Sequence, residues 1–357
     1  ATLLHPRFKP LPMLGLGSTV GTPPEGIRAK AVVVSSFKEL EEISSKVKGK
    51  IVVYNEKYVS YGETVVYRRD GASIASKYGA VASLISSITP FSLSTPHTGW
   101  QSYADNVTRI PTACITREDA NMLEGIYKRG KTIYIEIKME AKNLPPTISR
   151  NVVAELKGIT NPEKIVVISG HIDSWDVGEG AMDDGGGAFI SWHALAVLKA
   201  MGLRAKRTIR TILWTAEEEG YVGALAYAKT HLNETKNLDF VMESDIGTFA
   251  PLGLKYSGLP DVGCIVQEIL YLLRDLNATQ VQSPADGGPD LTKWLSEGVP
   301  GASLLNKNDR YFWFHHSAAD TMDVEEPEPL DNATALWATV AYIVADLSFD
   351  IPKNLTL

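Results

Sequence analysis

Short apolar runs alternate with longer amphipathic stretches from residue 150 onward. Five runs rich in β-branched residues predict strands, at residues 151–156, 164–170, 208–215, 239–244 and 301–305. Between them, residues 187–201 and 223–232 carry apolar side chains at helical spacing. Because nearly continuous apolar strands alternate with helices, this part predicts an α/β fold with a mixed, largely parallel central sheet flanked by helices.

The first part of the chain has a different pattern of apolar and polar residues. Residues 1–28 are rich in proline and glycine and predict irregular structure. Short β-branched runs follow at residues 30–36, 49–55, 81–88 and 132–139, with helical spacing at 71–80 and 117–130. We therefore expect residues 30–140 to form a smaller, β-rich block that is separate from the α/β part.

Candidate metal ligands follow the ends of the predicted strands in the second part. They are His171, Asp183, Glu217, Glu218, Asp245 and the adjacent pair His315 and His316. Because ligands bind beyond the carboxyl ends of parallel strands, we expect these side chains to converge. Imidazole nitrogen and carboxylate oxygen are donors that zinc accepts in catalytic sites, which also keep a position open for water. The set predicts a metal-dependent hydrolase.

Charge balance favours two divalent ions over one. Asp183, Glu218 and Asp245 carry three negative charges and Glu217 adds a fourth, which two divalent cations neutralise. A single cation would leave uncompensated negative charge in a partly buried cleft. Two metals about 3.5–4 Å apart, bridged by one carboxylate, also fit a two-metal hydrolase.

The remaining polar residues of this region have alternative roles. Only one of two adjacent glutamates easily faces a metal, so the other is the candidate base that takes a proton from the attacking water. Asp173 either accepts the second N–H of the His171 imidazole or is an ordinary surface residue, and Asp184 has the same alternatives. Either His315 or His316 is the ligand, and its neighbour can donate a hydrogen bond to an oxyanion.

Composition and charge argue against some classes of binding partner. The formal net charge of -7 gives no support to binding nucleic acid or acidic membranes, and no apolar run approaches the ~18 residues of a membrane span. Cys114 and Cys264 are too few for a disulfide framework. We expect two free, buried thiols rather than one bridge.

Five Asn-x-Ser/Thr acceptor sequences exceed the number expected by chance. They begin at Asn106, Asn233, Asn277, Asn332 and Asn354. Their number favours a secreted or lumenal glycoprotein over a cytosolic protein with accidental matches.

Four segments of the chain closely resemble the co-catalytic zinc exopeptidases, the family that holds aminopeptidases and glutamate carboxypeptidase II. They are residues 171–195, 212–224, 241–251 and 311–321, and the likeness extends over nearly the whole chain. The resemblance implies a zinc-exopeptidase fold with two Zn²⁺ ions and with Glu217 as general base. It implies that the zinc ligands are His171, Asp183 as the bridge, Glu218, Asp245 and His316.

The same resemblance carries expectations about organisation and substrate. It implies a protease-associated domain at residues 30–142, inserted into a peptidase domain formed by residues 1–29 and 143–357. It implies a cis peptide after Asp183. Relatives of this type look like dipeptidases that need free peptide termini, are secreted or lysosomal and form homodimers. In glutamate carboxypeptidase II a tyrosine precedes the last histidine ligand; His315 stands there in this chain, which leaves its role as an oxyanion donor open.

Two other functions remain compatible with the motifs. A metal-dependent hydrolase of N-acyl amino acids would use the same site, because the metal centre sets the reaction and the pocket sets the substrate. A non-catalytic, receptor-like relative on the same scaffold is the other alternative. The suitable residue types at every ligand position argue against it.

Overall fold

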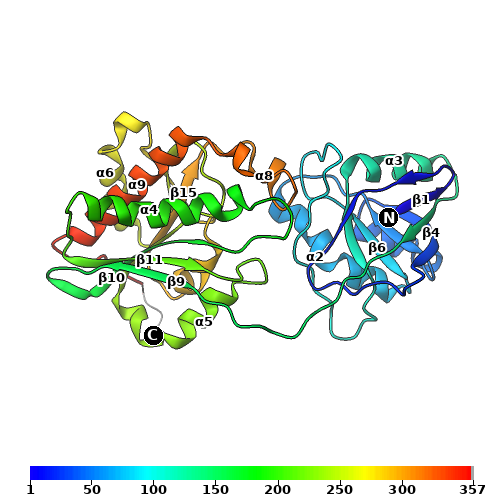
Figure 1. Cartoon of the computed structure of the whole chain (residues 1–357), viewed down its shortest axis with the longest axis horizontal. Helices are drawn as coiled ribbons and strands as arrows, with labels where there is room; N and C mark the ends of the chain where they lie inside the picture. Colours follow the sequence, from blue (N-terminus) through cyan, green and yellow to red (C-terminus); the bar gives the residue numbers. More distant parts are fainter. Residues whose placement is uncertain (355–357) are drawn as a thin grey trace. The chain divides into compact units, whose positions relative to one another are not determined.

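The computed structural model describes residues 1–354, which divide into two compact units (Figure 1). Unit 1 comprises Ala1–Thr147 and Phe312–Ala319. Unit 2 comprises Ile148–Tyr311 and the described residues from Asp320 onward. Each unit contains one β-sheet with helices packed against it.

Unit 2 is built on a seven-stranded sheet of order β14-β13-β15-β12-β10-β11-β9. The strands are β9 (Val152–Leu156), β10 (Asn161–His171), β11 (Arg207–Trp214), β12 (Leu238–Glu243), β13 (Pro251–Ser257), β14 (Gln280–Gln282) and β15 (Gly301–Asn306). The four central strands β15, β12, β10 and β11 run parallel, whereas β9 and β13 are antiparallel to their neighbours β11 and β15. The prediction of a mixed, largely parallel sheet is confirmed.

Helices cover both faces of this sheet. One face carries α4 (Gly186–Ala200), α6 (Pro260–Tyr271) and α9 (Pro327–Asp346), and the other carries α5 (Val222–Thr230) and α7 (Thr292–Ser296) (Figure 1). Strand β10 shows why both faces are apolar. Val166 and Ile168 pack into the first layer, while Ile165 and Val167 pack into the second. Side chains alternate along a strand, so a strand buried on both faces is a continuous apolar run.

Unit 1 has an eight-stranded sheet of order β2-β1-β8-β4-β5-β6-β7-β3. The strands are β1 (Thr2–His5), β2 (Lys9–Pro10), β3 (Met13–Gly15), β4 (Ile27–Val34), β5 (Ile51–Tyr54), β6 (Ala82–Ser86), β7 (Thr112–Ile115) and β8 (Tyr134–Ile137). Helix α3 (Arg117–Lys128) packs into one apolar layer, and α1 (Phe37–Glu42) and α2 (Tyr61–Lys77) pack into the other.

Several short helices complete the described chain. Helix α8 (Tyr311–Phe314) spans the sequence boundary between the units. Short 3₁₀ helices lie at Ser44–Lys46, Leu232–Asn237, Arg274–Leu276, Pro289–Leu291 and Met322–Val324. None of the helices in residues 1–354 combines the length and the apolar character that a membrane span needs.

The prediction that residues 1–28 are irregular is wrong for β1, β2, β3 and the first residues of β4, whereas residues 16–26 form no strand or helix. Strand β1 pairs antiparallel with β8, with Leu3 opposite Ile135, and β3 pairs antiparallel with β7. Leu3 and Leu11 are buried in the unit 1 core. These strands are short, and their partners lie far away in the sequence, so the local pattern of polar and apolar residues does not reveal them.

The two cysteines are both free, as expected, but only one is buried. Cys114 lies in β7 at the centre of the unit 1 core. Cys264 is exposed on α6, so the expectation of a second buried thiol is wrong. Helix α6 turns Val262 and Val266 toward the sheet, and a residue halfway between them in sequence faces away.

Helix α2 begins ten residues before the predicted stretch at 71–80 because Ser60 caps it. The Ser60 hydroxyl accepts a hydrogen bond from the backbone N–H of Glu63 at 3.3 Å. We expect Ser60→Ala to lower the free energy of unfolding of unit 1 by about 1 kcal/mol, because this N–H loses its partner. Urea unfolding followed by circular dichroism measures the change. Ser60→Thr keeps an accepting hydroxyl and should unfold like the parent; equal destabilisation by both variants would contradict the capping role.

A buried glutamate makes unit 1 sensitive to pH. Glu56 is 2% exposed, and neither carboxylate oxygen has a hydrogen-bond partner among the described residues. Burial raises the pKa of Glu56 well above its usual value, although Arg117 opposes the shift. The folded protein therefore holds this proton more tightly than the unfolded chain does. The contribution of this proton to the stability of the folded state is complete below pH 4.5, the ordinary pKa of a glutamate. It decreases as pH rises toward the pKa of Glu56 in the folded protein.

We expect Glu56→Gln to remove this pH dependence. The amide is nearly isosteric and stays neutral, so the variant should gain stability over the parent as pH rises from 4.5 to 8. Urea unfolding at several pH values measures the difference. Glu41→Gln, at an exposed position of α1, is the matched control and should follow the parent. A constant difference between Glu56→Gln and the parent over this range would refute the assignment.

Candidate metal centre

The candidate ligands of unit 2 gather at one edge of its sheet. His171 is the last residue of β10 and lies opposite Trp214, the last residue of β11. Glu217 follows β11 by three residues, and Asp245 follows β12 by two. Because β10, β11 and β12 are parallel neighbours, their carboxyl ends bring these side chains together.

The imidazole of His171 is surrounded by carboxylates. Its Nε2 atom lies 3.3 Å from Asp183 Oδ1, 3.3 Å from Asp245 Oδ1 and 3.8 Å from Glu217 Oε2. The ring itself is fully buried. His171, Asp184 and Asp245 also form a set whose potential ligand atoms all lie within 4.8 Å of one another. So many acids around one buried nitrogen suit a bound cation.

The other ring nitrogen of His171 is already engaged. Nδ1 lies 2.9 Å from the backbone carbonyl of Asp173, to which it donates a hydrogen bond. This bond places a proton on Nδ1 and leaves Nε2 as the nitrogen that faces the carboxylates. Burial lowers the pKa of His171, but Asp245, Asp173 and Asp183 outweigh it and raise the pKa well above its usual value. The surroundings of His171 therefore favour a positive charge at this position.

Asp183 and Asp184 lie on an irregular turn, η2 (Ala181–Gly185), and the peptide bond between them is cis. Asp184 accepts hydrogen bonds from the backbone N–H groups of His171 at 3.0 Å and Gly187 at 3.2 Å. A Cβ atom at Gly187 would lie 2.0 Å from Ser244 O, so only glycine permits this close approach. Asp184 thus ties the η2 turn to the end of β10.

Asp320 is a second anchor of the same turn, and the sequence did not reveal it. Its carboxylate accepts hydrogen bonds from the backbone N–H groups of Met182 at 2.8 Å and Asp183 at 3.2 Å. Asp320 is 2% exposed and lies four residues after His316 in the sequence. The only signal in the sequence was its position inside residues 311–321, a segment that resembles the zinc exopeptidases.

Asp173 positions the paired glutamates. Its carboxylate oxygens accept hydrogen bonds from the backbone N–H groups of Glu217 at 3.0 Å and Glu218 at 3.2 Å. The same carboxylate is 3.7 Å from His171 Nδ1, farther than its own backbone carbonyl. Asp173 therefore contacts the imidazole mainly through its main chain and holds the glutamate turn through its side chain.

Both glutamates are largely buried. Trp175 donates an indole hydrogen bond to Glu218 Oε2 at 2.6 Å, which fixes one side of that carboxylate. Burial and the neighbouring Asp245 raise the pKa of Glu217 to about 10, with His171 opposing. A nearby cation would favour the ionised carboxylate and lower this pKa.

Two further buried acids, Glu243 and Asp290, adjoin the cluster. The sequence did not identify Glu243 as part of it. Glu243 ends β12 with no exposed surface, and Asp290 is 3% exposed. Burial raises the pKa of Asp290 to about 6 and the pKa of Glu243 well above its usual value. The backbone N–H of Leu291 donates to Glu243 Oε2 at 3.2 Å.

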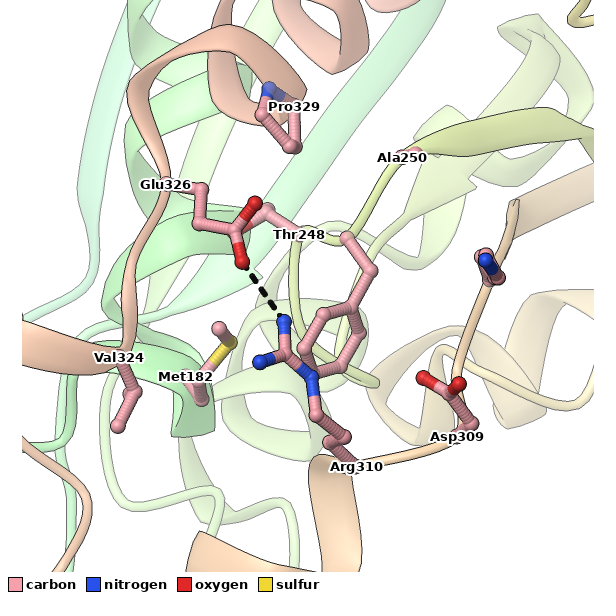
Figure 2. Close-up of a pocket in the computed structure, with 10 residues that line it drawn as sticks. Met182, Thr248, Ala250, Asp309, Arg310, Val324, Glu326 and Pro329 are labelled. Carbon is pink, nitrogen blue, oxygen red and sulfur yellow. Dashed lines mark hydrogen bonds and ion pairs between the residues drawn. The ribbon is translucent and has the colours of Figure 1, made fainter.

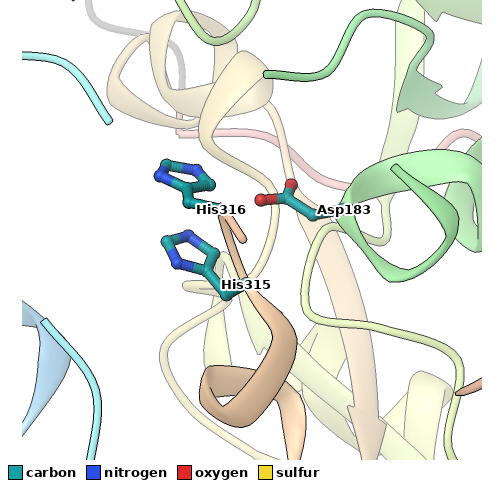
Figure 3. A group of neighbouring side chains, drawn as sticks. All are labelled: Asp183, His315 and His316. Carbon is teal, nitrogen blue, oxygen red and sulfur yellow. The ribbon is translucent and has the colours of Figure 1, made fainter. Parts of the chain in front are cut away.

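His315 and His316 belong to unit 1. Their rings stack with centroids 3.5 Å apart, and both are largely buried (Figure 3). His316 donates from Nδ1 to the backbone carbonyl of Thr98 at 3.1 Å. His316 thus engages a backbone carbonyl through Nδ1, as His171 does.

Four of the five acceptor asparagines are exposed. They are Asn106, Asn233, Asn277 and Asn354, whereas Asn332 on α9 is half-buried and its Thr334 is buried. The acceptor sequence at Asn354 continues to Thr356, which lies outside the described residues. Glycosylation at these asparagines stays a prediction.

Comparison with known proteins identifies a matching family model and relatives with similar sequences. The model described as Peptidase family M28 matches residues 151–341. Carboxypeptidase Q of Xenopus laevis is 54% identical over 353 residues, which cover 99% of this chain and 75% of that protein. Carboxypeptidase Q of Homo sapiens is 52% identical over 354 residues, with the same coverage.

Solved structures extend the comparison. A peptidase M28 precursor from Shewanella amazonensis is 32% identical with a TM-score of 0.95, covering 100% of this chain and 82% of that chain. A zinc aminopeptidase from Bacillus subtilis is 20% identical with a TM-score of 0.70, covering 99% of this chain and 85% of that chain. The second likeness concerns the fold alone.

Proposed function

This chain belongs to peptidase family M28 and is a metallopeptidase, and from that premise we propose that it is a di-zinc exopeptidase of small peptides, above all dipeptides with free termini. The observation that carries the proposal is the buried imidazole of His171, whose Nε2 atom is within 3.8 Å of three carboxylates. A histidine and several acids in this arrangement are a typical donor set of catalytic zinc.

The donor set fits zinc in chemistry as well as in number. The proposed ligands are His171, Asp183 as the bridge, Glu218, Asp245 and His316. His171 and His316 each donate Nδ1–H to a backbone carbonyl, the contact that commonly fixes the tautomer of a metal-ligating histidine. Asp320 supports the assignment of His316, because it holds the backbone of Asp183 and follows His316 by four residues. Two divalent cations neutralise Asp183, Glu217, Glu218 and Asp245 together.

Glu217 is the proposed general base. When bound, zinc supplies Lewis acidity that makes water more acidic and polarises a carbonyl. Glu217 takes the proton of the attacking water at its carboxylate and delivers it to the nitrogen of the leaving amine. Asp173 keeps Glu217 in place through the backbone N–H, so the carboxylate need not reorganise during the reaction.

His315 is proposed to donate a hydrogen bond to the oxyanion that forms at the attacked carbonyl. Its ring is fixed between His316, on which it stacks, and Tyr61, whose centroid lies 4.9 Å away. Tyr61 and His315 both belong to unit 1. The role rests on its place directly before His316 in the sequence.

The proposal also covers the domain organisation, the oligomeric state and the cellular location of the protein. We propose that residues 30–142 are a protease-associated domain inserted between residues 1–29 and 143–357 of a peptidase domain. We also propose a homodimer in a secretory compartment, extracellular or lysosomal. The exposed acceptor asparagines support the compartment, because glycan transfer requires accessible sites.

A panel of dipeptides tests the substrate class. The parent protein is assayed on one dipeptide sequence with free ends, with an N-acetyl group and with a C-terminal amide. We expect the free dipeptide to have the highest kcat/KM. Preference for the N-acetyl compound would instead favour the hydrolase of N-acyl amino acids. Failure to hydrolyse any of them, with full metal content, would favour the receptor-like alternative.

A further inference from the structure

A pocket beside the metal cluster has features that the proposed peptidase chemistry does not use. It lies wholly in unit 2, between the loops after β12 and β15 and the chain that leads into α9 (Figure 2). Its volume of about 360 Å³ is at the lower end of the range of ligand pockets, roughly 300–1,000 Å³. A ligand of this size is a single amino acid or a very short peptide.

The pocket presents charges of both signs. Lys307 and Arg310 bring two positive charges, and Asp309 and Glu326 bring two negative ones. Arg310 donates to Glu326 Oε1 at 2.8 Å, and its guanidinium lies over the ring of Phe249, 5.5 Å from the centroid. Glu326 is the only carboxylate that pairs with Arg310 among the described residues, and the Lys307 ammonium has no ion-pair partner there. Arginine can bind a second carboxylate because its planar fork carries five N–H donors.

The pocket walls are fixed by hydrogen bonds before any ligand binds. The backbone N–H of Lys307 donates to the carbonyl of Ala250 at 3.0 Å. Asn306 donates from its side chain to the carbonyl of Gly247 at 2.7 Å, and Thr248 donates to Glu325 at 2.9 Å. The first two bonds join β15 and the loop after it to the loop that leads into β13, and the third joins that loop to the segment before α9. A preformed pocket loses little conformational freedom when a ligand binds.

Apolar side chains supply the rest of the lining. Met182, Val324 and Pro329 face the same space as the charged groups (Figure 2). Met182 immediately precedes Asp183, whose carboxylate lies 3.3 Å from His171 Nε2. A ligand in the pocket would therefore contact the turn that carries a candidate metal ligand.

We propose that this pocket binds a small zwitterion, a free α-amino acid with an apolar side chain. Its carboxylate pairs with Arg310 and Lys307, its ammonium pairs with Glu326, and its side chain packs on Met182 and Phe249. Free amino acids are the products of dipeptide hydrolysis, but the binding itself does not depend on the proposed function.

Isothermal titration calorimetry of the chelator-treated protein with L-leucine tests the proposal. We expect saturable binding, with N-acetyl-leucine and leucinamide each binding at least about tenfold more weakly because each lacks one charged contact. Arg310→Gln should weaken L-leucine binding by about tenfold or more. Lys293→Gln, an exposed lysine on α7 outside the pocket, is the matched control and should bind like the parent.

Two results would overturn the proposal. The first is no saturable heat with L-leucine at concentrations up to about 10 mM, the range of a very weak complex. The second is unchanged binding in Arg310→Gln. Thermal unfolding of Arg310→Gln shows that the variant is folded, so lost binding is not lost structure. The titration uses metal-free protein, so it measures binding independently of catalysis. An enzyme that is inactive but still binds L-leucine would contradict the proposed function and support this binding site.

Discussion

Replacing Glu217 with glutamine is expected to lower kcat by about 10²–10⁴-fold while the protein keeps its metal. The amide has almost the same shape, but it cannot accept the proton of the attacking water or return it to the leaving amine. Glu217 is not among the proposed zinc ligands, so elemental analysis should give the parent's metal content. Steady-state kinetics on a dipeptide with free termini measures the loss.

Glu219→Gln is the matched control for this experiment. Glu219 follows the pair and is more exposed than Glu217 and Glu218. We expect it to retain most of the parent's kcat. If Glu217→Gln turned over at a rate near that of the parent, the proton would have to pass through another group. Loss of metal together with activity would show that Glu217 binds an ion.

Removal of the metal should abolish activity and destabilise unit 2. Without cations, the acids Asp183, Glu217 and Asp245 lie close together around the buried His171 with no metal charge to offset their mutual repulsion. We expect chelation to lower turnover by about 10³-fold or more, the several kcal/mol that a metal contributes to such a transition state. Zinc should restore the activity. At free zinc a thousandfold above the Kd, binding stabilises the folded state by about 4.1 kcal/mol.

Differential scanning calorimetry and kinetics measure the two effects on the same sample. Protein dialysed without a chelator is the control for handling. An unchanged Tm after complete metal removal would mean that the acid cluster is stable by itself. Activity that survives metal removal would contradict the metallopeptidase mechanism for this site.

The architecture of unit 2 could be predicted from sequence because its signals are local. The apolar runs at 164–170, 208–215 and 239–244 correspond to β10, β11 and β12, which position the site. Parallel strands with both faces buried read as continuous apolar segments. Once three parallel strands are recognised, the convergence of His171 with the acids after β11 and β12 follows from the topology.

Other elements were missed for identifiable reasons. Strands β1 and β3 depend on partners that are distant in sequence, so their own composition indicates irregular structure. The start of α2 carried a readable signal, Ser60 followed three residues later by Glu63, which is the pattern of a capping box. The strand β13 contains Gly253 with a positive φ and starts at Pro251, two features that argue against a strand.

The surroundings of the candidate ligands were harder to predict than the ligands. Asp320, Trp175 and the carboxylate of Asp173 act through hydrogen bonds to backbone or side-chain atoms from distant segments. Such contacts depend on the exact course of loops, which residue type and spacing do not encode. A metal-binding histidine or acid is recognised by its chemistry, whereas a supporting acid looks like any other acid.

Anomalous diffraction at the zinc edge, from crystals of fully active protein, tests the central claim most directly. The account predicts two peaks roughly 3.5–4 Å apart, both in contact with the Asp183 carboxylate, one of them bound by Nε2 of His171. A single peak at full activity, or two peaks that do not share Asp183, would contradict it.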